Sequence, residues 1–189
     1  VVNFLERNPD RHAAVFMKQK ANLRDAAYAQ IVWAINVLGL EDDYDMPEST
    51  LRIKKKSTGQ LIIFRGVDNA NKVKSIKVPF GSIGIVWFEE ADQFSGIAEI
   101  RKVNQSVTRG GNSAVRLYTF NPPRSKSCWI NRHVESELAE DARYFASTYL
   151  DAPAEWLGEQ FIADAAHLKD TDPLSYEHEY LGLPVGNGT

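Results

Sequence analysis

The order of apolar and polar positions predicts a fold built from alternating strands and helices. Residues 13–17 form a short apolar run that predicts a strand. Apolar residues then recur at helical spacing from Ala27 to Leu38, with Asn22 expected to cap the helix and Gly39 to end it. A strand followed at once by a helix is the unit from which parallel sheets are built.

The pattern further along the chain predicts more elements of both kinds. Residues 51–56 and 60–64 flank a Ser-Thr-Gly turn and predict a β-hairpin. Downstream of residue 90, the pattern predicts a helix at 97–107, a strand at 114–120, a helix at 125–138 and a final core strand at 144–148. Two short helical patterns follow after residue 151, and Pro173 suits the first turn of the second.

The stretch from Ile83 to Asp92 is the centre of the predicted fold. Residues 85–88 have no polar position, which predicts a strand buried on both faces of a parallel sheet. Glu89 and Glu90 follow at its carboxyl end, where open α/β sheets bind ligands. Neighbouring residues of a strand point in opposite directions, so the two carboxylates can serve different purposes. The alternative is a strand followed by two solvated glutamates.

Composition narrows the class of protein without identifying it. A chain of 189 residues is long enough for one domain with a sizeable core. Its formal net charge of −3 gives no global sign of nucleic-acid binding, so any DNA-binding surface must be local. Cys128 has no second cysteine to pair with, which suits a reducing cytoplasm, and no apolar run reaches membrane-spanning length. No histidine pairs with another at metal-ligand spacing.

Several stretches, taken in their order, resemble one protein family. They are KQKANLRD at 18–25, IFRG at 63–66, WFEEAD at 87–92, YTFNPP at 118–123, TYLDAP at 148–153, LKDTDP at 168–173 and YEHEYLG at 176–182. Together they closely resemble the large terminase subunit of tailed phages, of the prophage PBSX type. The resemblance covers nearly the whole chain, and the order and spacing of the motifs are more specific than any motif alone.

The resemblance implies an α/β fold, a RecA-like P-loop NTPase core of the additional-strand type with a mainly parallel sheet. The core would occupy residues 1–149, and a small helical linker subdomain, residues 150–189, would lead to a nuclease domain beyond Thr189. The sequence contains no G-x-x-x-x-G-K-[S/T] phosphate loop. In the family that loop and its helix lie directly upstream of the matching segment. Val1 is no natural start, and residues 1–7 would be the tail of that helix, leaving the core incomplete at its N-terminus.

The resemblance also implies roles for the polar residues at the strand ends. Glu89 would hold the Mg²⁺ of bound ATP, as the Walker B acid, and Glu90 would be the catalytic base that activates water. Thr119 and Asn121 match the motif that senses the γ-phosphate and couples hydrolysis to DNA movement. Asn121 could instead simply cap the turn before Pro122.

Phosphoryl transfer usually also needs a cation that stabilises the transition state. Arg65, Arg101 and Arg109 are the candidates, and Arg65 ranks first because it follows a predicted strand within the family-like Phe-Arg-Gly. For each arginine the alternative is a surface position or a structural ion pair.

The function implied is the ATPase motor of a phage DNA-packaging terminase in the host cytoplasm. ATP and Mg²⁺ would be its cofactors, and duplex DNA, the small terminase subunit and the portal protein its partners. A ring of identical subunits without membrane attachment is expected during packaging. The alternatives are a helicase or other RecA-like DNA-dependent ATPase, and a non-enzymatic remnant that binds DNA or a partner. A two-carboxylate nuclease or hydrolase at Glu89 and Glu90 is disfavoured, because adjacent strand residues diverge.

Overall fold

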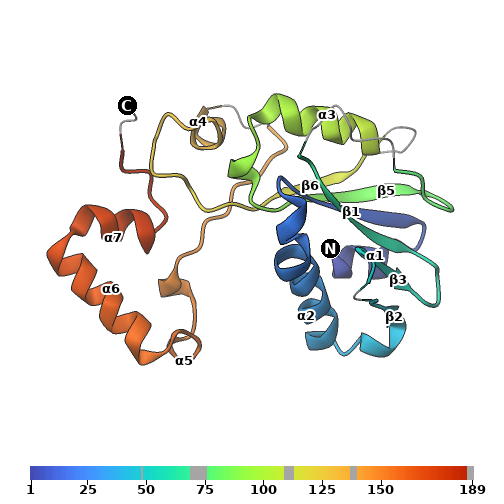
Figure 1. Ribbon diagram of the computed structural model, residues 1–189, viewed down its shortest axis with the longest axis horizontal. Helices are drawn as coiled ribbons and strands as arrows, with labels where there is room; N and C mark the ends of the chain where they lie inside the picture. Colours follow the sequence, from blue (N-terminus) through green and yellow to red (C-terminus); the bar gives the residue numbers. More distant parts are fainter. Residues whose placement is uncertain (48, 69–75, 109–112, 137–139, 187–189) are drawn as a thin grey trace. The chain divides into compact units, whose positions relative to one another are not determined.

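The computed structural model describes residues 1–47, 49–68, 76–108, 113–136 and 140–186. The chain divides into two compact units, Val1–Phe120 and Asn121–Thr189, which are described one at a time (Figure 1). The division into a core and a linker subdomain after residue 149 stays a prediction.

The first unit is built on one sheet with the strand order β2-β3-β4-β1-β5-β6. Strand β1 is parallel to β4 and β5, and β5 is parallel to β6, whereas β2, β3 and β4 pair antiparallel. The mainly parallel sheet and the hairpin of β3 and β4 confirm the sequence prediction. The strands are β1 (Arg11–Met17), β2 (Tyr44–Asp45), β3 (Arg52–Lys55), β4 (Leu61–Gly66), β5 (Ser82–Phe88) and β6 (Val115–Tyr118).

Helices cover both faces of this sheet (Figure 1). On one face, α1 (Val2–Arg7) and α2 (Ala29–Val37) pack on alternate side chains of β1 in the main core cluster. On the other face lies α3 (Ile97–Val107), at the bounds that the sequence predicts, and there the Phe16 and Phe88 rings stack at 5.4 Å. A fully buried side chain of this size contributes about 1.5–3 kcal/mol, so both faces stabilise the central strands.

The helix after β1 starts differently from the prediction. A 3-10 turn, η1 (Lys20–Leu23), and a π-helical turn, η2 (Arg24–Tyr28), precede α2. Asn22 lies inside η1, which has no side-chain cap, so the prediction that Asn22 caps the helix is wrong. Gly39 ends the helical region as predicted, with φ of 66°, a conformation that glycine adopts without strain.

The two early family-like segments meet at the carboxyl end of the sheet. Gly66, the last residue of β4, lies so close to η1 that a Cβ added to it would be 2.4 Å from the Cβ of Lys20. Only glycine therefore allows β4 and η1 to approach this closely.

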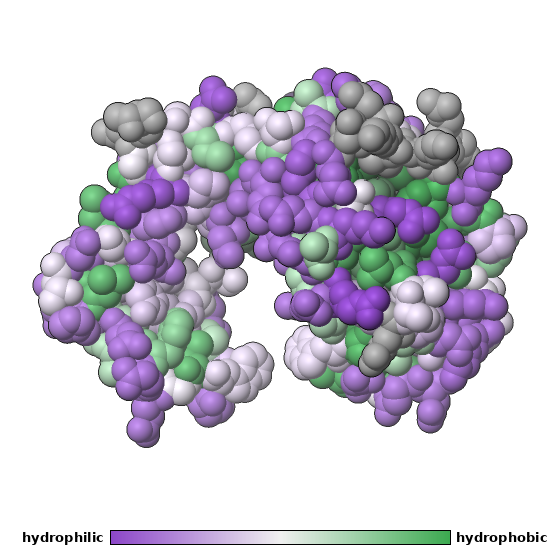
Figure 2. Space-filling model, in the orientation of Figure 1, coloured by the Kyte–Doolittle hydropathy of each residue, from purple (hydrophilic) through white to green (hydrophobic). Residues whose placement is uncertain are grey.

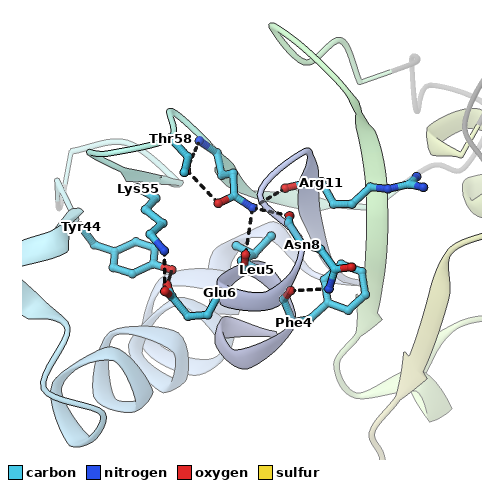
Figure 3. A network of polar contacts seen from close by, with 9 residues as sticks. Phe4, Leu5, Glu6, Asn8, Arg11, Tyr44, Lys55 and Thr58 are labelled. Carbon is cyan, nitrogen blue, oxygen red and sulfur yellow. Dashed lines mark hydrogen bonds and ion pairs between the residues drawn. The ribbon is translucent and has the colours of Figure 1, made fainter.

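A buried amide holds the end of α1 against the hairpin (Figure 3). Gln60 is 1% exposed, and its Nε2 donates to three backbone carbonyl oxygens, those of Leu5 (3.2 Å), Asn8 (2.9 Å) and Arg11 (2.7 Å). The three carbonyls lie along the connection from the end of α1 to the start of β1, so one buried amide holds this connection in place.

The Glu6 carboxylate forms a second tie between α1 and the antiparallel strands (Figure 3). It accepts hydrogen bonds from the Tyr44 hydroxyl, at 2.6 Å, and from the Lys55 ammonium. Lys55 belongs to a run of three lysines. The ion pair with Glu6 shows that the charge of this lysine is paired within the fold.

The second unit is helical in its described part. It contains α4 (Trp129–Ser136), η6 (Tyr149–Asp151), α5 (Ala154–Leu157), α6 (Glu159–Thr171) and α7 (Pro173–Glu179). Four aromatic rings, those of Tyr149, Phe161, Tyr176 and Tyr180, pack edge to face or stacked in its centre. Figure 2 shows a mostly hydrophilic surface with apolar areas over α5 and α6.

Two further 3-10 turns, η3 (Glu41–Asp43) and η5 (Ala91–Gln93), belong to the first unit.

Two predicted elements of the second unit are corrected by the structure. The core strand predicted at 144–148 is wrong: Phe145 is 87% exposed and no described strand pairs with this stretch. Thr148 instead forms a capping box with Asp151, which directs the chain into η6. The helix predicted from residue 125 begins at Trp129, and residues 137–138 lie outside the described part. In the part of the chain that the structure describes, no helix is long and apolar enough to cross a membrane.

Candidate functional site

The two adjacent glutamates lie in a turn directly after β5. The strand ends at Phe88, so the expectation that strand alternation separates Glu89 from Glu90 is wrong. Two backbone hydrogen bonds fix the turn: the Glu89 N–H donates to the Phe16 carbonyl at 2.9 Å, and the Ala91 N–H donates to the Thr119 carbonyl at 2.9 Å. The turn is thus fastened to the chain on both sides of β5, at the carboxyl ends of β1 and β6.

Glu90 has an unusual backbone conformation and an unusual side chain. Its φ of 52° and ψ of 50° are left-handed, and it is the one described non-glycine residue with a positive φ. This conformation costs about 1–2 kcal/mol for a residue with a Cβ, and such strain gathers at functional sites. Its Oε2 atom is buried and has no hydrogen-bond partner among the described residues. A buried carboxylate oxygen of this kind is suited to receive a proton or a bound water.

Glu89 is brought together with Thr119, as the sequence predicts for two neighbouring strand ends. The Thr119 hydroxyl donates to the Glu89 carboxylate, and the Thr119 N–H donates to the Phe88 carbonyl at 3.0 Å. The Trp87 indole Nε1–H in turn donates to the Thr119 hydroxyl oxygen at 2.6 Å. A carboxylate and a hydroxyl side by side are oxygen ligands of the kind that Mg²⁺ binds, directly or through water.

The Trp87 contact was missed at the level of sequence, where this residue is expected to be a core aromatic. Its ring does pack against the core cluster, but it is partly exposed and its N–H orients Thr119. Tryptophan usually finds a partner for its N–H when it is partly buried, which is the signal that could have revealed this role.

The remaining predicted site residues are not gathered at this turn. Asn121 is exposed and is the first residue of the second unit, so its place beside the glutamates stays a prediction. Arg65 is exposed near the end of β4 and pairs in register with Phe16 of β1. One strand therefore separates Arg65 from β5, which places their backbones roughly 10 Å apart. Arg101 is exposed on α3, and Arg109 lies outside the described residues.

An ion pair that sequence reasoning did not predict lies next to the turn. Lys18 directly follows β1, and its Nζ lies 2.6 Å from the Glu99 Oε1 in the first turn of α3. The other oxygen of Glu99 accepts from the Ser95 N–H (2.8 Å) and hydroxyl (2.9 Å). Burial opposes ionisation, but the bonds from Lys18 and Ser95 outweigh it and lower the pKa of Glu99. The pair ties the start of α3 to the carboxyl end of β1.

Magnesium does not need a dense cluster of protein ligands. Among the described residues no group of three His, Cys, Asp or Glu side chains converges on a metal position. Mg²⁺ keeps several waters and is bound by one or two carboxylates together with substrate phosphates. The pair of Glu89 and Thr119 fits that requirement. The nearby Asp92 is partly buried, which raises its pKa.

The fold and the carboxyl-edge turn define the class of protein first. A mostly parallel sheet, flanked by helices and with paired carboxylates after a central strand, has a RecA-like α/β fold. The chain belongs to a particular family within that class, described as "Phage terminase large subunit", whose match spans residues 1–183.

Individual relatives agree with this assignment. The large terminase subunit of Bacillus phage SPP1 is 33% identical over 171 residues, which are 88% of this chain and 40% of the SPP1 protein. The large terminase of the thermophilic bacteriophage D6E superimposes with a TM-score of 0.65 at 14% identity, covering 97% of this chain and 43% of that one. A second D6E structure is in complex with ADP. The ATPase domain of the Thermus phage P74-26 large terminase superimposes with a TM-score of 0.63 at 12% identity, covering 97% of this chain and 80% of that domain.

Proposed function

We propose that this chain is the ATPase-motor part of a phage DNA-packaging terminase, in which ATP hydrolysis drives duplex DNA into the prohead. The observation that carries the proposal is the turn after β5, which holds Glu90 in a strained conformation with a buried, unpartnered oxygen. Family membership and the ADP complex of the D6E relative support it. The chain spans 40% of the length of its SPP1 relative, so the activity proposed is that of the intact protein.

The roles proposed for Glu89 and Glu90 are argued from the geometry of the turn, and those of Asn121 and Arg65 from the family resemblance. Glu89, oriented by the hydroxyl of Thr119, would hold Mg²⁺, which neutralises phosphate charge when it is bound. The Oε2 of Glu90 would accept the proton of the attacking water, because it has no competing donor among the described residues. Asn121 would sense the γ-phosphate, and Arg65 would supply positive charge to the transition state of a bound ATP.

The other parts of the motor are proposed with the same function. The cradle for the β- and γ-phosphates is not in this sequence, which has no G-x-x-x-x-G-K-[S/T], and it would be supplied from outside residues 1–189. Residues 1–149 would be the ATPase core and residues 150–189 the linker subdomain. The small terminase subunit, the portal protein and duplex DNA would be partners of a ring of such subunits in the host cytoplasm. Membership of the terminase family disfavours a general helicase.

The roles of the two glutamates are tested by comparing Glu90→Gln with Glu89→Gln in the intact protein. Glu90→Gln removes the base but keeps size and hydrogen bonding. We expect it to retain MgATP binding while single-turnover hydrolysis falls by at least about 10²-fold. Glu89→Gln removes charge beside the metal, so its defect should ease as Mg²⁺ is raised. Single-turnover rates and nucleotide affinities across a Mg²⁺ titration measure both effects.

Thr119→Val is a useful companion, because it removes only the hydroxyl that contacts Glu89. It should shift the Mg²⁺ dependence in the same direction as Glu89→Gln. Equal behaviour of the two glutamine variants would show that the turn is a surface feature. A Mg²⁺-dependent defect in Glu90→Gln alone would show that Glu90 holds the metal and Glu89 is the base.

A further inference from the structure

One long stretch of this acidic chain carries positive charges and no acidic residue. Residues 100–134, here called the acid-free segment, hold seven of the 22 lysines and arginines and none of the 25 aspartates and glutamates. A local excess of this kind creates a positive potential even when the net charge of the chain is negative. The segment spans the end of the first unit and the start of the second, and the positive side chains of the second unit are the ones that lie on an ordered loop.

Within the second unit, the acid-free segment forms a loop whose backbone is fixed. Asn131 is 8% exposed, and its Nδ2 donates to the carbonyls of Pro123 (2.7 Å) and Ser125 (2.8 Å). A β-bridge to Gly186 adds two more hydrogen bonds, from Lys126 N–H and to the Arg124 carbonyl, both 2.8 Å. Four hydrogen bonds thus order the loop before any partner arrives, which lowers the entropy lost on binding.

The cations on this fixed loop face solvent. Arg124 and Lys126 on the loop, and Arg132 on α4, are exposed, and none forms an ion pair within the described residues. Hydrogen bonds from Ser175 lower the pKa of Asp172, and the positive charge of Arg124 lowers it by a smaller amount. The Asp172 carboxylate is therefore close enough to Arg124 to interact with its charge. In the described part of the chain, no carboxylate forms an ion pair with Lys126 or Arg132.

The surroundings of these cations favour a polyanion over a protein surface. Protein interfaces are anchored by large apolar or aromatic side chains, and no exposed side chain of that kind occurs in the described residues between 121 and 136. Arginine, lysine, serine and asparagine are instead the side chains that contact DNA phosphates. Ser125 and Ser127 place two hydroxyls beside the cations on the same loop.

We propose that Arg124, Lys126 and Arg132 contact the phosphate backbone of duplex DNA. This inference rests on the proposed packaging function and adds the residues that would touch the packaged substrate. Only Pro122 and Pro123 lie between Asn121, the proposed γ-phosphate sensor, and Arg124, so the two roles are joined by a short covalent path. The contact is to phosphates and does not select a base sequence.

The test compares two triple variants that each remove three positive charges. Arg124→Gln/Lys126→Gln/Arg132→Gln alters the proposed contact, whereas Arg7→Gln/Arg52→Gln/Lys54→Gln alters exposed cations elsewhere and is the matched control. Fluorescence anisotropy with a labelled duplex of mixed sequence, without nucleotide, gives the affinity of this chain at several NaCl concentrations from 50 to 200 mM. Thermal unfolding monitored by circular dichroism checks that each variant is folded.

We expect the first triple variant to lose at least about tenfold in affinity at 50 mM salt. The slope of log affinity against log salt should become less steep by roughly 2 to 3, since each phosphate contact contributes about 0.9. The control should stay within about threefold of the wild type. The charge-preserving Arg124→Lys/Arg132→Lys should keep most of the affinity and the slope.

Equal losses in the two triple variants would overturn the inference, because a general charge effect would then explain the binding. So would an unchanged slope in the first triple, or a wild-type chain that does not bind duplex DNA at 50 mM salt. Binding is measured without ATP, so its result is independent of whether Glu90→Gln abolishes hydrolysis in the intact protein. Failure of the DNA contact and failure of the proposed ATPase are thereby distinguished.

Discussion

At the scale of single residues, the turn after β5 gives Glu90 a different backbone conformation from Glu89, although neither residue belongs to the strand. Its left-handed backbone is held by hydrogen bonds from the residues on either side of it, Glu89 and Ala91, to neighbouring chain segments. Two solvated surface glutamates would relax to an unstrained conformation, because nothing would oppose the change. The separation of Glu89 from Glu90 therefore comes from the turn, and the rigidity of the turn comes from β1 and β6.

His12 makes the stability of the first unit depend on pH. It is fully buried, accepts the Leu61 N–H at Nδ1 (2.9 Å) and contacts the Phe80 carbonyl through Nε2 (2.8 Å). Burial lowers its pKa, although the Phe80 carbonyl acts in the opposite direction. Folding thus favours the neutral ring, so its contribution is fully present above the unfolded pKa of about 6.5 and is lost as pH falls below that value.

We therefore expect the urea midpoint to fall between pH 7.5 and pH 5.5, and to fall less in His12→Gln. The carboxylates with lowered pKa, Glu6, Glu99 and Asp172, lose their contribution only near and below their ordinary values of 4.5 for the glutamates and 3.8 for the aspartate, so they do not interfere in this window. The four histidines of the chain allow a control, because His167 is exposed and His167→Gln should leave the pH dependence unchanged. A parallel pH response in wild type and His12→Gln would contradict the assignment.

At the scale of elements, the sequence predicts those parts whose signals are local. The bounds of α3 follow from apolar residues at helical spacing after Gly96, and the hairpin follows from its Ser-Thr-Gly turn. The strand predicted at 144–148 failed because a short aromatic run cannot show whether a partner strand exists. Asn22 failed as a cap because the helical region already begins at Lys20, where the chain packs closely against Gly66.

The candidate site was predictable to a similar degree. The contact of Glu89 with Thr119 follows from two strand ends at the same edge of a parallel sheet. The left-handed turn at Glu90 was not predictable, because glutamate has no preference for that conformation. Nor was the pair of Lys18 and Glu99, which are 81 residues apart and meet only in the folded chain.

The tie between α1 and the hairpin predicts a large effect from one buried side chain. Gln60→Leu keeps the approximate volume but removes the amide that donates to three backbone carbonyls, of which those of Leu5 and Asn8 keep a backbone N–H donor. We expect the free energy of unfolding to fall by about 1–3 kcal/mol in urea denaturation, which is the usual cost of removing the partner of a buried polar group. Gln30→Leu on the exposed side of α2 is the control and should stay within about 0.5 kcal/mol. Similar losses in both variants would mean that the Gln60 amide does not anchor α1.

At the scale of the whole molecule, the sequence has carboxylates for ATP hydrolysis but no phosphate-loop motif of the form G-x-x-x-x-G-K-[S/T]. The turn after β5 supplies carboxylates, but several backbone N–H groups and a lysine are needed to hold the β- and γ-phosphates, and the sequence lacks the motif that provides them. We expect the isolated chain to release no appreciable phosphate from ATP in a steady-state assay. A rate equal to that of an intact terminase, and lost in Glu90→Gln, would show either that hydrolysis does not require a phosphate loop or that another segment of this chain serves as one.

The exposed edge of the sheet has a consequence for how the chain behaves in solution. Within the described residues β6 pairs only with β5, and all four of its side chains are exposed, among them Val115, Leu117 and Tyr118. Such an edge presents unpaired backbone donors and acceptors next to apolar surface, and it accepts a strand from any chain that offers one. Concentrated preparations of these 189 residues should therefore self-associate and precipitate through β6 unless another strand covers it.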